Sequence, residues 1–329
     1  MNTLLNLLVA AALAGTPLLL GTLGEILTEK SGNINLGVEG MMFMGAIAGL
    51  AAPFVYEQWA LKVESAPVGW IGAFLALMAS FLAGALGALI YGFLTITLRA
   101  NQNVTGLTLT IFGTGVGNFF GEYLGSRAGG YVALGDEMKS AFANLSIPGL
   151  SQIPVIGKLL FQYNWVVYFA IALALLMNHF FKRTRVGLNL RAVGEDPAAA
   201  DAAGIHVSRY KYMATVIGGG VCGIGGMYMS MVTTSCVWVH NCVSGYGWLA
   251  VALVIFAAWS PARALLAALI FGGLTVLRLY LRIPGMPMQI YEMFPFIATI
   301  LVLIVTSIRQ SRENVQPKSC GFNYFREER

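Results

Sequence analysis

Charged side chains are scarce in this chain. Of its 329 residues, 11% are Asp, Glu, Lys or Arg, against about 25% in an average soluble domain. Apolar residues make up 57% of the chain. They gather in runs of about 20 residues, the length that a helix needs to cross the ~30 Å hydrocarbon core of a bilayer. This composition excludes a large soluble domain and predicts a membrane protein.

Cysteine is also scarce, with four residues in the chain. Four scattered cysteines exclude a disulfide scaffold and a zinc ribbon. Cys236, His240 and Cys242 share one short segment, but three candidate ligands without a fourth nearby do not make a structural metal site. We therefore expect neither a metal nor a cofactor. A disulfide between Cys236 and Cys242 would need an oxidising compartment, and the sequence leaves that question open.

A phosphate-binding loop is missing. Such a loop ends in Gly-Lys followed by Ser or Thr, whereas Leu159 follows the only Gly-Lys pair, Gly157-Lys158. We therefore expect that the chain does not hydrolyse ATP itself and is not an enzyme. The net charge of +5 could indicate a nucleic-acid partner in a soluble protein. Here we assign it to loops at the membrane surface and expect no nucleic-acid partner.

Nine apolar runs are separated by clusters of charged residues, Pro and Gly. Only helices and closed barrels satisfy their backbone hydrogen bonds inside a bilayer, and these runs are about twice as long as a barrel strand. The sequence thus predicts an all-α polytopic integral membrane protein with about nine transmembrane helices, eight to ten at the limits. The expected spans are Leu4–Leu23, Leu36–Tyr56, Trp70–Leu98, Val104–Gly125, Tyr163–Phe181, Tyr212–Thr233, Trp248–Trp259, Ala262–Leu281 and Ile290–Ile308. No Lys or Arg precedes the first run, so we expect a retained span and not a secretory signal peptide.

Basic residues favour one orientation of these spans. With the N-terminus outside, the inner segments hold fourteen of the 20 Lys and Arg residues, and cytoplasmic loops carry an excess of these residues. We expect an outer N-terminus and a cytoplasmic tail over residues 309–329. The long outer segment, Arg127 to Gln162, contains Pro148, Gly149 and Pro154, which favour surface or re-entrant pieces over a further span.

The fourth run carries two neighbouring rows of residues at four-residue spacing, which places each row on one face of a helix. A glycine row allows another helix to approach closely. A polar row is costly against lipid, so it is expected to face either a buried helix interface or a solute pathway, and the sequence does not choose between them. The glycines are Gly113, Gly117, Gly121 and Gly125, and the polar residues are Thr110, Thr114, Asn118 and Glu122. The third run has small residues at every fourth position from Gly72 to Gly92, which we assign to packing.

A polar segment from Gly24 to Gly40 separates the first two runs. It contains three glutamates and two asparagines. Polar residues at a helix break are typical of irregular backbone that lines a cavity, and on this interpretation Asn35 and Glu39 are candidate pathway residues. The alternative is a plain loop in which Glu29 and Lys30 are solvated.

The segment from Lys182 to Lys211 contains signals for one short helix. Asp196 suits the N-cap, Pro197 the first helical position and Gly204 the position after the C-cap, which predicts a helix over Pro197–Ala203. So short a helix is marginal in water, and its alanine-rich face suits a cleft in another molecule. The alternative is a frayed helix in a polar loop.

Three stretches carry a resemblance to a known family. They are GEILTEKSGNINLGVEGMM at 24–42, RTRVGLNLRAVGEDPAAADAAGI at 183–205 and GGGVCGIGGMYM at 218–229. They resemble the permease subunits of ABC importers for simple sugars and nucleosides, close to the ribose permease superfamily and closer to its nucleoside-type branch. The likeness continues through 244–273 and covers most of the chain. It implies a single transmembrane permease domain, residues 1–329, with the ribose-permease-like fold.

The resemblance also implies partners and a site. In this family two permeases, often different, stand on two cytoplasmic ATPase subunits in a bacterial-type inner membrane and receive solute from an extracytoplasmic binding protein. The short helix in the cytoplasmic loop, here within 182–211, docks on the ATPase. The residues that this implies for the contact are Gly194, Glu195, Asp196, Pro197, Ala199, Ala200 and Gly204.

Two departures bear on the substrate. The segment Thr233 to Ser244 differs from what the family leads us to expect, and Ala257 stands where the family usually has Gly. We expect a nucleoside or related solute. The alternatives are a simple sugar, a branched-chain amino acid, or a secondary transporter that works alone, although the sequence shows no paired broken helices of the kind that such transporters have.

Overall fold

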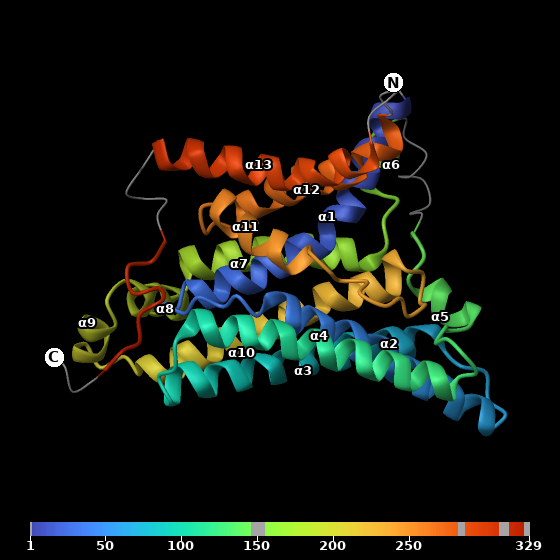
Figure 1. Cartoon of the computed structure of the whole chain (residues 1–329), viewed down its shortest axis with the longest axis horizontal. Coiled ribbons are helices and arrows are strands. Elements are labelled where there is room, and N and C mark those ends of the chain that lie inside the picture. Colours follow the sequence, from blue (N-terminus) through green and yellow to red (C-terminus); the bar gives the residue numbers. More distant parts are fainter. Residues whose placement is uncertain (1, 146–154, 282–286, 309–315, 326–329) are drawn as a thin grey trace.

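The computed structural model describes residues 2–145, 155–281, 287–308 and 316–325. Its long helices run roughly along the longest axis of the molecule (Figure 1). The helices are α1 (Asn2–Glu29), α2 (Val38–Lys62), α3 (Gly69–Gly92), α4 (Gln102–Arg127), α5 (Asp136–Ala141), α6 (Ile156–Leu160), α7 (Trp165–Arg183), α8 (Arg185–Glu195), α9 (Pro197–Ala202), α10 (Val207–Tyr228), α11 (Tyr246–Phe256), α12 (Pro261–Tyr280) and α13 (Met288–Ile308), with π-helical turns η1 (Phe93–Thr97) and η2 (Met229–Thr233). The prediction of an all-helical membrane protein is confirmed.

Each of the nine expected spans coincides with one helix: α1 to α4, α7, and α10 to α13. Six of these helices are long and apolar enough to cross a membrane. Helix α4 has the length, with 26 residues, but its Gly, Thr and Asn residues lower its hydropathy. Helix α11 has 11 residues, which is too short for a ~30 Å hydrocarbon core at ~1.5 Å per residue.

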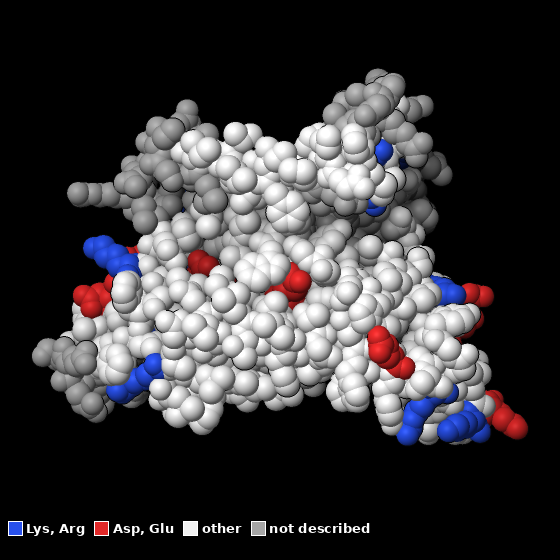
Figure 2. Space-filling view, in the orientation of Figure 1, with Lys and Arg blue, Asp and Glu red and all other residues white. Residues whose placement is uncertain are grey.

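The two ends of the molecule carry different elements. Figure 1 shows the N-terminus with α5 and α6 at one end, and the C-terminus with α8 and α9 at the other. In Figure 2 the Lys and Arg side chains lie only toward the two ends of the molecule, and the band between them is white apart from a few acidic patches. This is the charge distribution of a protein whose middle lies in hydrocarbon.

Helix α10 forms the centre of the core, packed against α1, α2 and α3. Gly223 lies close to two of these helices, because a Cβ built on Gly45 of α2 would lie 2.2 Å from the Gly223 carbonyl oxygen and one on Gly84 of α3 would lie 2.9 Å from its Cα. Small residues allow this approach of three backbones. The small residues of α3 from Gly72 to Gly92 are buried, so their predicted role in packing is confirmed.

The glycine row of α4 also packs as predicted. All four of its glycines are buried. A Cβ on Gly113 would lie 2.3 Å from the carbonyl oxygen of Gly40 on α2, and one on Gly121 would overlap the indole ring of Trp238. The row therefore brings α4 against α2 and against the segment that precedes α11.

Several helix boundaries differ from the expected ones, and the end of α1 is the one that bears on the site. Helix α1 continues six residues beyond Leu23 to Glu29, so the break between the first two spans is confined to residues 30–37. This correction has a physical reason: Glu25 and Glu29 have partners inside the protein and so do not end the helix. The segment Arg127 to Gln162, which is expected to be outside, contains the short helices α5 and α6, whereas Pro148, Gly149 and Pro154 lie outside the described residues.

Candidate transport pathway and coupling surface

The connection between α1 and α2 is buried and hydrogen-bonded to its surroundings. Glu29 is 5% exposed, Asn33 1% and Asn35 0%. The interpretation of this segment as a solvated loop, with Glu29 in water, is therefore wrong. The indole N–H of Trp259, which follows α11, donates to Glu29 Oε2, and burial of an ionisable group is favourable only with such a partner.

Other helices hold this connection through its backbone. The Tyr91 hydroxyl of α3 donates to the carbonyl oxygen of Ile34, and Ile34 N donates to Gln102 Oε1 of α4 at 2.8 Å. Asn35 N donates to Glu25 Oε1 at 3.0 Å. Asn35 also binds within the connection, where its Oδ1 accepts from Gly37 N at 2.9 Å. The structure thus places Asn35 inside the protein, where it fixes the connection.

Glu39 lies near the start of α2 and is 7% exposed. Its Oε2 accepts from Gly245 N, immediately before α11, at 3.2 Å. A Cβ on Gly247 would overlap the backbone of Glu39, so α2 and α11 are in direct contact here. Glu39 therefore joins the start of α2 to the start of the short helix α11.

The polar row of α4 becomes more exposed along the helix. Thr110 is half-buried and donates to the carbonyl oxygen of Leu36 at 2.8 Å. Thr114 and Asn118 are also half-buried, and the Glu122 side chain is 71% exposed. Hydrogen bonds between buried segments account for Thr110, as one of the two interpretations predicted. The outer half of the row borders open space.

The segment from Thr234 to Gly245 covers this half, and we call it the outer loop because it lies at the end of the molecule that holds the N-terminus, which is expected to be outside. Asn118 Nδ2 donates to Asn241 Oδ1 at 2.8 Å, and His240 Nδ1 lies 3.0 Å from Glu122 Oε1. On its other side the outer loop pairs with the segment after α4, where Trp238 N donates to the Val132 carbonyl oxygen at 2.9 Å. The departure from the family pattern thus lies over the polar row of α4.

The cysteines of the outer loop are free thiols in this structure. Burial raises the pKa of both Cys236 and Cys242 to about 12. His240 lies beside Glu122, and no group of three His, Cys, Asp or Glu side chains that could hold a metal occurs among the described residues.

At the other end, the predicted short helix is present as α9, with the predicted caps. Asp196 Oδ1 accepts from Ala199 N at 2.9 Å, Pro197 occupies the first turn, and Gly204 has φ +84°, which suits a glycine after a helix. Helix α8, which precedes it, was not predicted. Its signal was an amphipathic spacing of Gly187, Leu190 and Val193, all buried, after the N-cap Thr184, whose Oγ1 accepts from Gly187 N at 3.0 Å.

Two of the residues expected to contact an ATPase are turned inward. Ala200 is 4% exposed and packs with Val193 and Val207. Gly194 is buried, and a Cβ on it would lie 2.3 Å from the Lys30 carbonyl oxygen. This corrects the expectation of direct contact, because these two positions serve the packing of α8 and α9 on their own chain. Of the expected set, Pro197 is half-buried and the exposed residues are Glu195, Asp196, Ala199 and Gly204.

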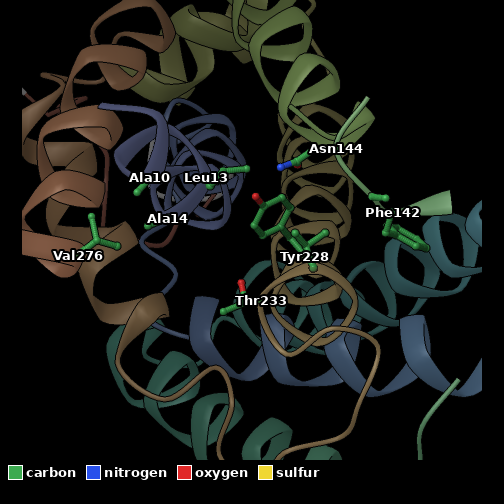
Figure 3. Close-up of a pocket in the computed structure, with 10 residues that line it drawn as sticks. Ala10, Leu13, Ala14, Phe142, Asn144, Tyr228, Thr233 and Val276 are labelled. Atoms are coloured by element: carbon green, nitrogen blue, oxygen red, sulfur yellow. The ribbon is translucent and has the colours of Figure 1, made fainter. Parts of the chain in front are cut away.

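A cavity of about 450 Å³ lies between α1, η2 and α12, near the end with the N-terminus (Figure 3). Its lining is mostly apolar, and Figure 3 shows the polar ends of Asn144 and Tyr228 on the side opposite the α1 residues Ala10, Leu13 and Ala14. Tyr228 is 1% exposed, and its hydroxyl accepts from Asn164 Nδ2 at 3.4 Å. None of the predicted pathway residues lines this cavity. The sequence signal for Tyr228 was its position two residues after the glycine-rich run Gly218–Gly226.

Comparison with known proteins agrees with this architecture. The chain matches the family described as "Branched-chain amino acid transport system / permease component" over residues 7–306. It is 34% identical to the guanosine ABC transporter permease protein NupQ of Bacillus subtilis, over 91% of this chain and 92% of the relative. It is 30% identical to the nucleoside ABC transporter permease protein NupC of Lactococcus lactis, over 99% and 98%.

A permease protein of Haloferax volcanii named for a glucose ABC transporter is 33% identical, over 98% of each chain. Among solved structures, an inward-facing metal-chelate type ABC transporter matches 92% of this chain and 85% of its own, with a TM-score of 0.43 and 13% identity. Because the family match spans nearly the whole set of membrane helices, the chain belongs to the family of branched-chain amino acid transport system permease components and is a multi-pass membrane subunit of the ABC permease type.

Proposed function

We propose that this chain is one of two permease subunits of an ATP-driven importer and provides part of the pathway for a nucleoside or a related solute. The observation that carries the proposal is the likeness, over nine-tenths or more of each chain, to relatives named for guanosine and for nucleosides. A second permease, a cytoplasmic ATPase and an extracytoplasmic binding protein are the partners proposed with it, in a bacterial-type inner membrane.

The pathway is proposed to follow the polar row of α4. A nucleoside carries hydroxyl and ring-nitrogen groups that lose water when they enter a membrane, and side-chain hydroxyl, amide and carboxylate groups can replace those hydrogen bonds. Thr114, Asn118 and Glu122 offer such groups on the more exposed part of α4. Solute that binds Asn118 would compete with the outer loop, because Asn241 bonds to both the nitrogen and the oxygen of the Asn118 amide.

Coupling is proposed to occur at the exposed surface of α9, with the N-terminus outside and the C-terminus in the cytoplasm. Glu195, Asp196 and Ala199 lie on that surface. The small side chain of Ala199 allows a partner to approach closely. Asp196 stabilises the first turn of α9 through its N-cap hydrogen bond. The ATPase is proposed to supply all nucleotide chemistry, since this chain lacks a Gly-Lys-Ser/Thr sequence.

A simple sugar is the second candidate substrate, favoured by the 33% identity to the permease named for glucose. Nucleosides contain a sugar ring, so the two classes present similar hydroxyl groups to a polar row. The family description also includes branched-chain amino acids, which would present a charged ammonium and carboxylate instead.

Uptake into proteoliposomes tests the proposal. Vesicles would contain this chain, the second permease and the ATPase, with the binding protein outside, and uptake of labelled guanosine, glucose and leucine would be compared with ATP or a non-hydrolysable analogue inside. We expect guanosine uptake that needs ATP hydrolysis. Glucose uptake alone would replace the substrate with the second candidate, and uptake by this chain without the ATPase would contradict the importer and favour a secondary transporter.

A further inference from the structure

The described part of the C-terminal tail, residues 316–325, lies across three separate connections at the α9 end of the molecule. We call it the tail segment. Pro317 and Cys320 of the tail segment are buried, and burial raises the pKa of the Cys320 thiol. Its polar contacts are made mostly to backbone carbonyls of other segments. The tail segment is therefore built into the fold at a place where several moving parts of a transporter would meet.

One half of these contacts holds α8 and α9. Ser319 donates to the Gly194 carbonyl oxygen twice, from its backbone N at 3.0 Å and from Oγ at 2.6 Å. The Tyr324 hydroxyl donates to Asp201 Oδ2 on α9 at 2.9 Å, and its ring packs against the small cluster around Ala200. A helix as short as α9 is marginal alone, so these contacts help to fix its position.

The other half holds the connections between membrane helices. Asn323 Nδ2 donates to the carbonyl oxygens of Arg99, at 2.6 Å, and Ala100, at 3.2 Å, between α3 and α4. Asn323 Oδ1 accepts from Gln102 Nε2 at 3.2 Å. The other amide atom of Gln102, Oε1, accepts from Ile34 N in the buried α1–α2 connection. The Gln102 side chain thus bridges Asn323 and the α1–α2 connection.

Adjacent residues of one short segment, Asn323 and Tyr324, therefore bind different parts of the protein. Tyr324 binds α9, and Asn323 binds the α3–α4 connection and, through Gln102, the α1–α2 connection. Pro317 and Cys320 are buried, whereas Phe322 is 72% exposed. Apolar burial therefore anchors one part of the segment, and the hydrogen bonds of Asn323 and Tyr324 add to it at the other part.

We infer that the tail segment links α9 to the α1–α2 connection, and that Tyr324 and Asn323 are positioning residues for coupling. This inference rests on the proposed function. A displacement of α9 by the ATPase would pull on Tyr324, and Asn323 would pass that displacement to Gln102 and Ile34. Loss of the contacts of either Tyr324 or Asn323 should leave the ATPase bound but reduce the amount of solute moved for each ATP hydrolysed.

Two variants each remove the contacts of one positioning residue, and a third variant serves as the matched control. Tyr324→Phe removes only the hydroxyl that binds Asp201. Asn323→Ala removes the side-chain contacts of Asn323 to Arg99, Ala100 and Gln102. Phe322→Ala truncates the exposed side chain directly before Asn323. In the reconstituted complex, we expect the ratio of ATP hydrolysed to solute taken up to rise about threefold or more for the first two, as the loss of a net hydrogen bond of ordinary strength allows. Phe322→Ala should keep the wild-type ratio.

Hydrogen exchange in the same complexes supplies a second readout. Tyr324→Phe should speed exchange of the backbone amides of residues 31–37, which Tyr324 does not touch. A wild-type ratio and unchanged exchange at 31–37 in Tyr324→Phe would overturn the inference, and this conservative variant decides the matter even if Asn323→Ala fails to fold. Failure of the proposed function is distinguishable, because it would appear as no ATP-dependent uptake by the wild-type complex.

Discussion

Asn118 on α4 and Asn241 in the outer loop are joined by two hydrogen bonds, one from each polar atom of the Asn118 side-chain amide. Asn118 Nδ2 donates to Asn241 Oδ1 at 2.8 Å, and Asn118 Oδ1 accepts from the Asn241 backbone N at 3.2 Å. Asn241 has φ +57°, a conformation that Asn tolerates better than most residues. These two hydrogen bonds thus hold the outer loop over the polar row of α4.

Replacing Asn118 with Leu should abolish uptake while the subunit still assembles with its ATPase. The leucine cannot form either hydrogen bond and places an apolar side chain in the polar row. Thr108→Val is the matched control, because Thr108 is exposed on the same helix and its hydroxyl bonds only to the Val104 carbonyl oxygen. Uptake and co-purification of the ATPase are the measurements. Normal uptake by Asn118→Leu would leave the polar row with a packing role alone.

A methyl group added to α4 should lower the stability of the protein on one face of the helix and leave it nearly unchanged on the other. A Cβ at Gly113 would lie 2.3 to 2.5 Å from the backbone of Gly40, whereas one at Gly115 meets nothing within 4 Å. Gly113→Ala must therefore push α4 away from α2, at a cost of about 1–3 kcal/mol. Gly115→Ala should stay within about 1 kcal/mol of the wild type. Thermal unfolding in detergent measures both, and equal stabilities would contradict this packing.

Sequence patterns were sufficient to predict the helices of the nine expected spans and the small residues that pack them. Apolar runs located each of these helices, and four-residue spacing assigned the glycine row of α4 to a helix contact. These features depend on local order in the chain, which is visible in the sequence. The cap signals of α9 are local in the same way.

Contacts between distant residues were not predictable in this way. The hydrogen bond from Trp259 to Glu29 joins residues 230 positions apart, and it explains why α1 continues through its glutamates. Ala200 was assigned to a partner surface by the family resemblance. Its burial depends on Val193 and Val207 from the helices on either side.

The thiols of Cys236 and Cys242 should react slowly in the folded protein. Their pKa values are raised to about 12, so at pH 8 the reactive thiolate is roughly one in 10,000 of each population. A raised thiol pKa means that reactivity increases only as the pH approaches that value. Mass spectrometry after alkylation without reductant should show neither a disulfide nor modification at pH 8, and full modification after unfolding. Rapid modification of both thiols in folded protein would contradict their burial.

Tryptophan at two adjacent positions of α9 should separate docking from folding. Ala199 is exposed and Ala200 is 4% exposed. Ala199→Trp should leave thermal stability unchanged and uncouple ATP hydrolysis from uptake, because it adds bulk to the docking surface. Ala200→Trp should instead overfill the cluster with Val193 and Val207 and lower stability by about 1–3 kcal/mol.

Asp196→Ala provides a milder comparison on the same helix. It removes the N-cap bond to Ala199 N and should cost about 1 kcal/mol, with partial coupling retained. Solute-stimulated ATPase activity and thermal unfolding of the same preparations check these expectations. Full coupling in Ala199→Trp would contradict the assignment of the exposed α9 surface.

Cross-linking from α9 tests most directly whether this chain is the membrane subunit of an ATP-driven importer. A single cysteine would be placed by Ala199→Cys, or as a control by Ala66→Cys between α2 and α3 at the other end of the molecule, and labelled with a thiol-specific photo-cross-linker in the assembled complex in membranes. The native cysteines are largely buried and should contribute little background. We predict a cross-link from position 199 to the ATPase and none from position 66. Absence of the product from position 199 in a complex that imports solute, or its appearance from position 66, would contradict the account.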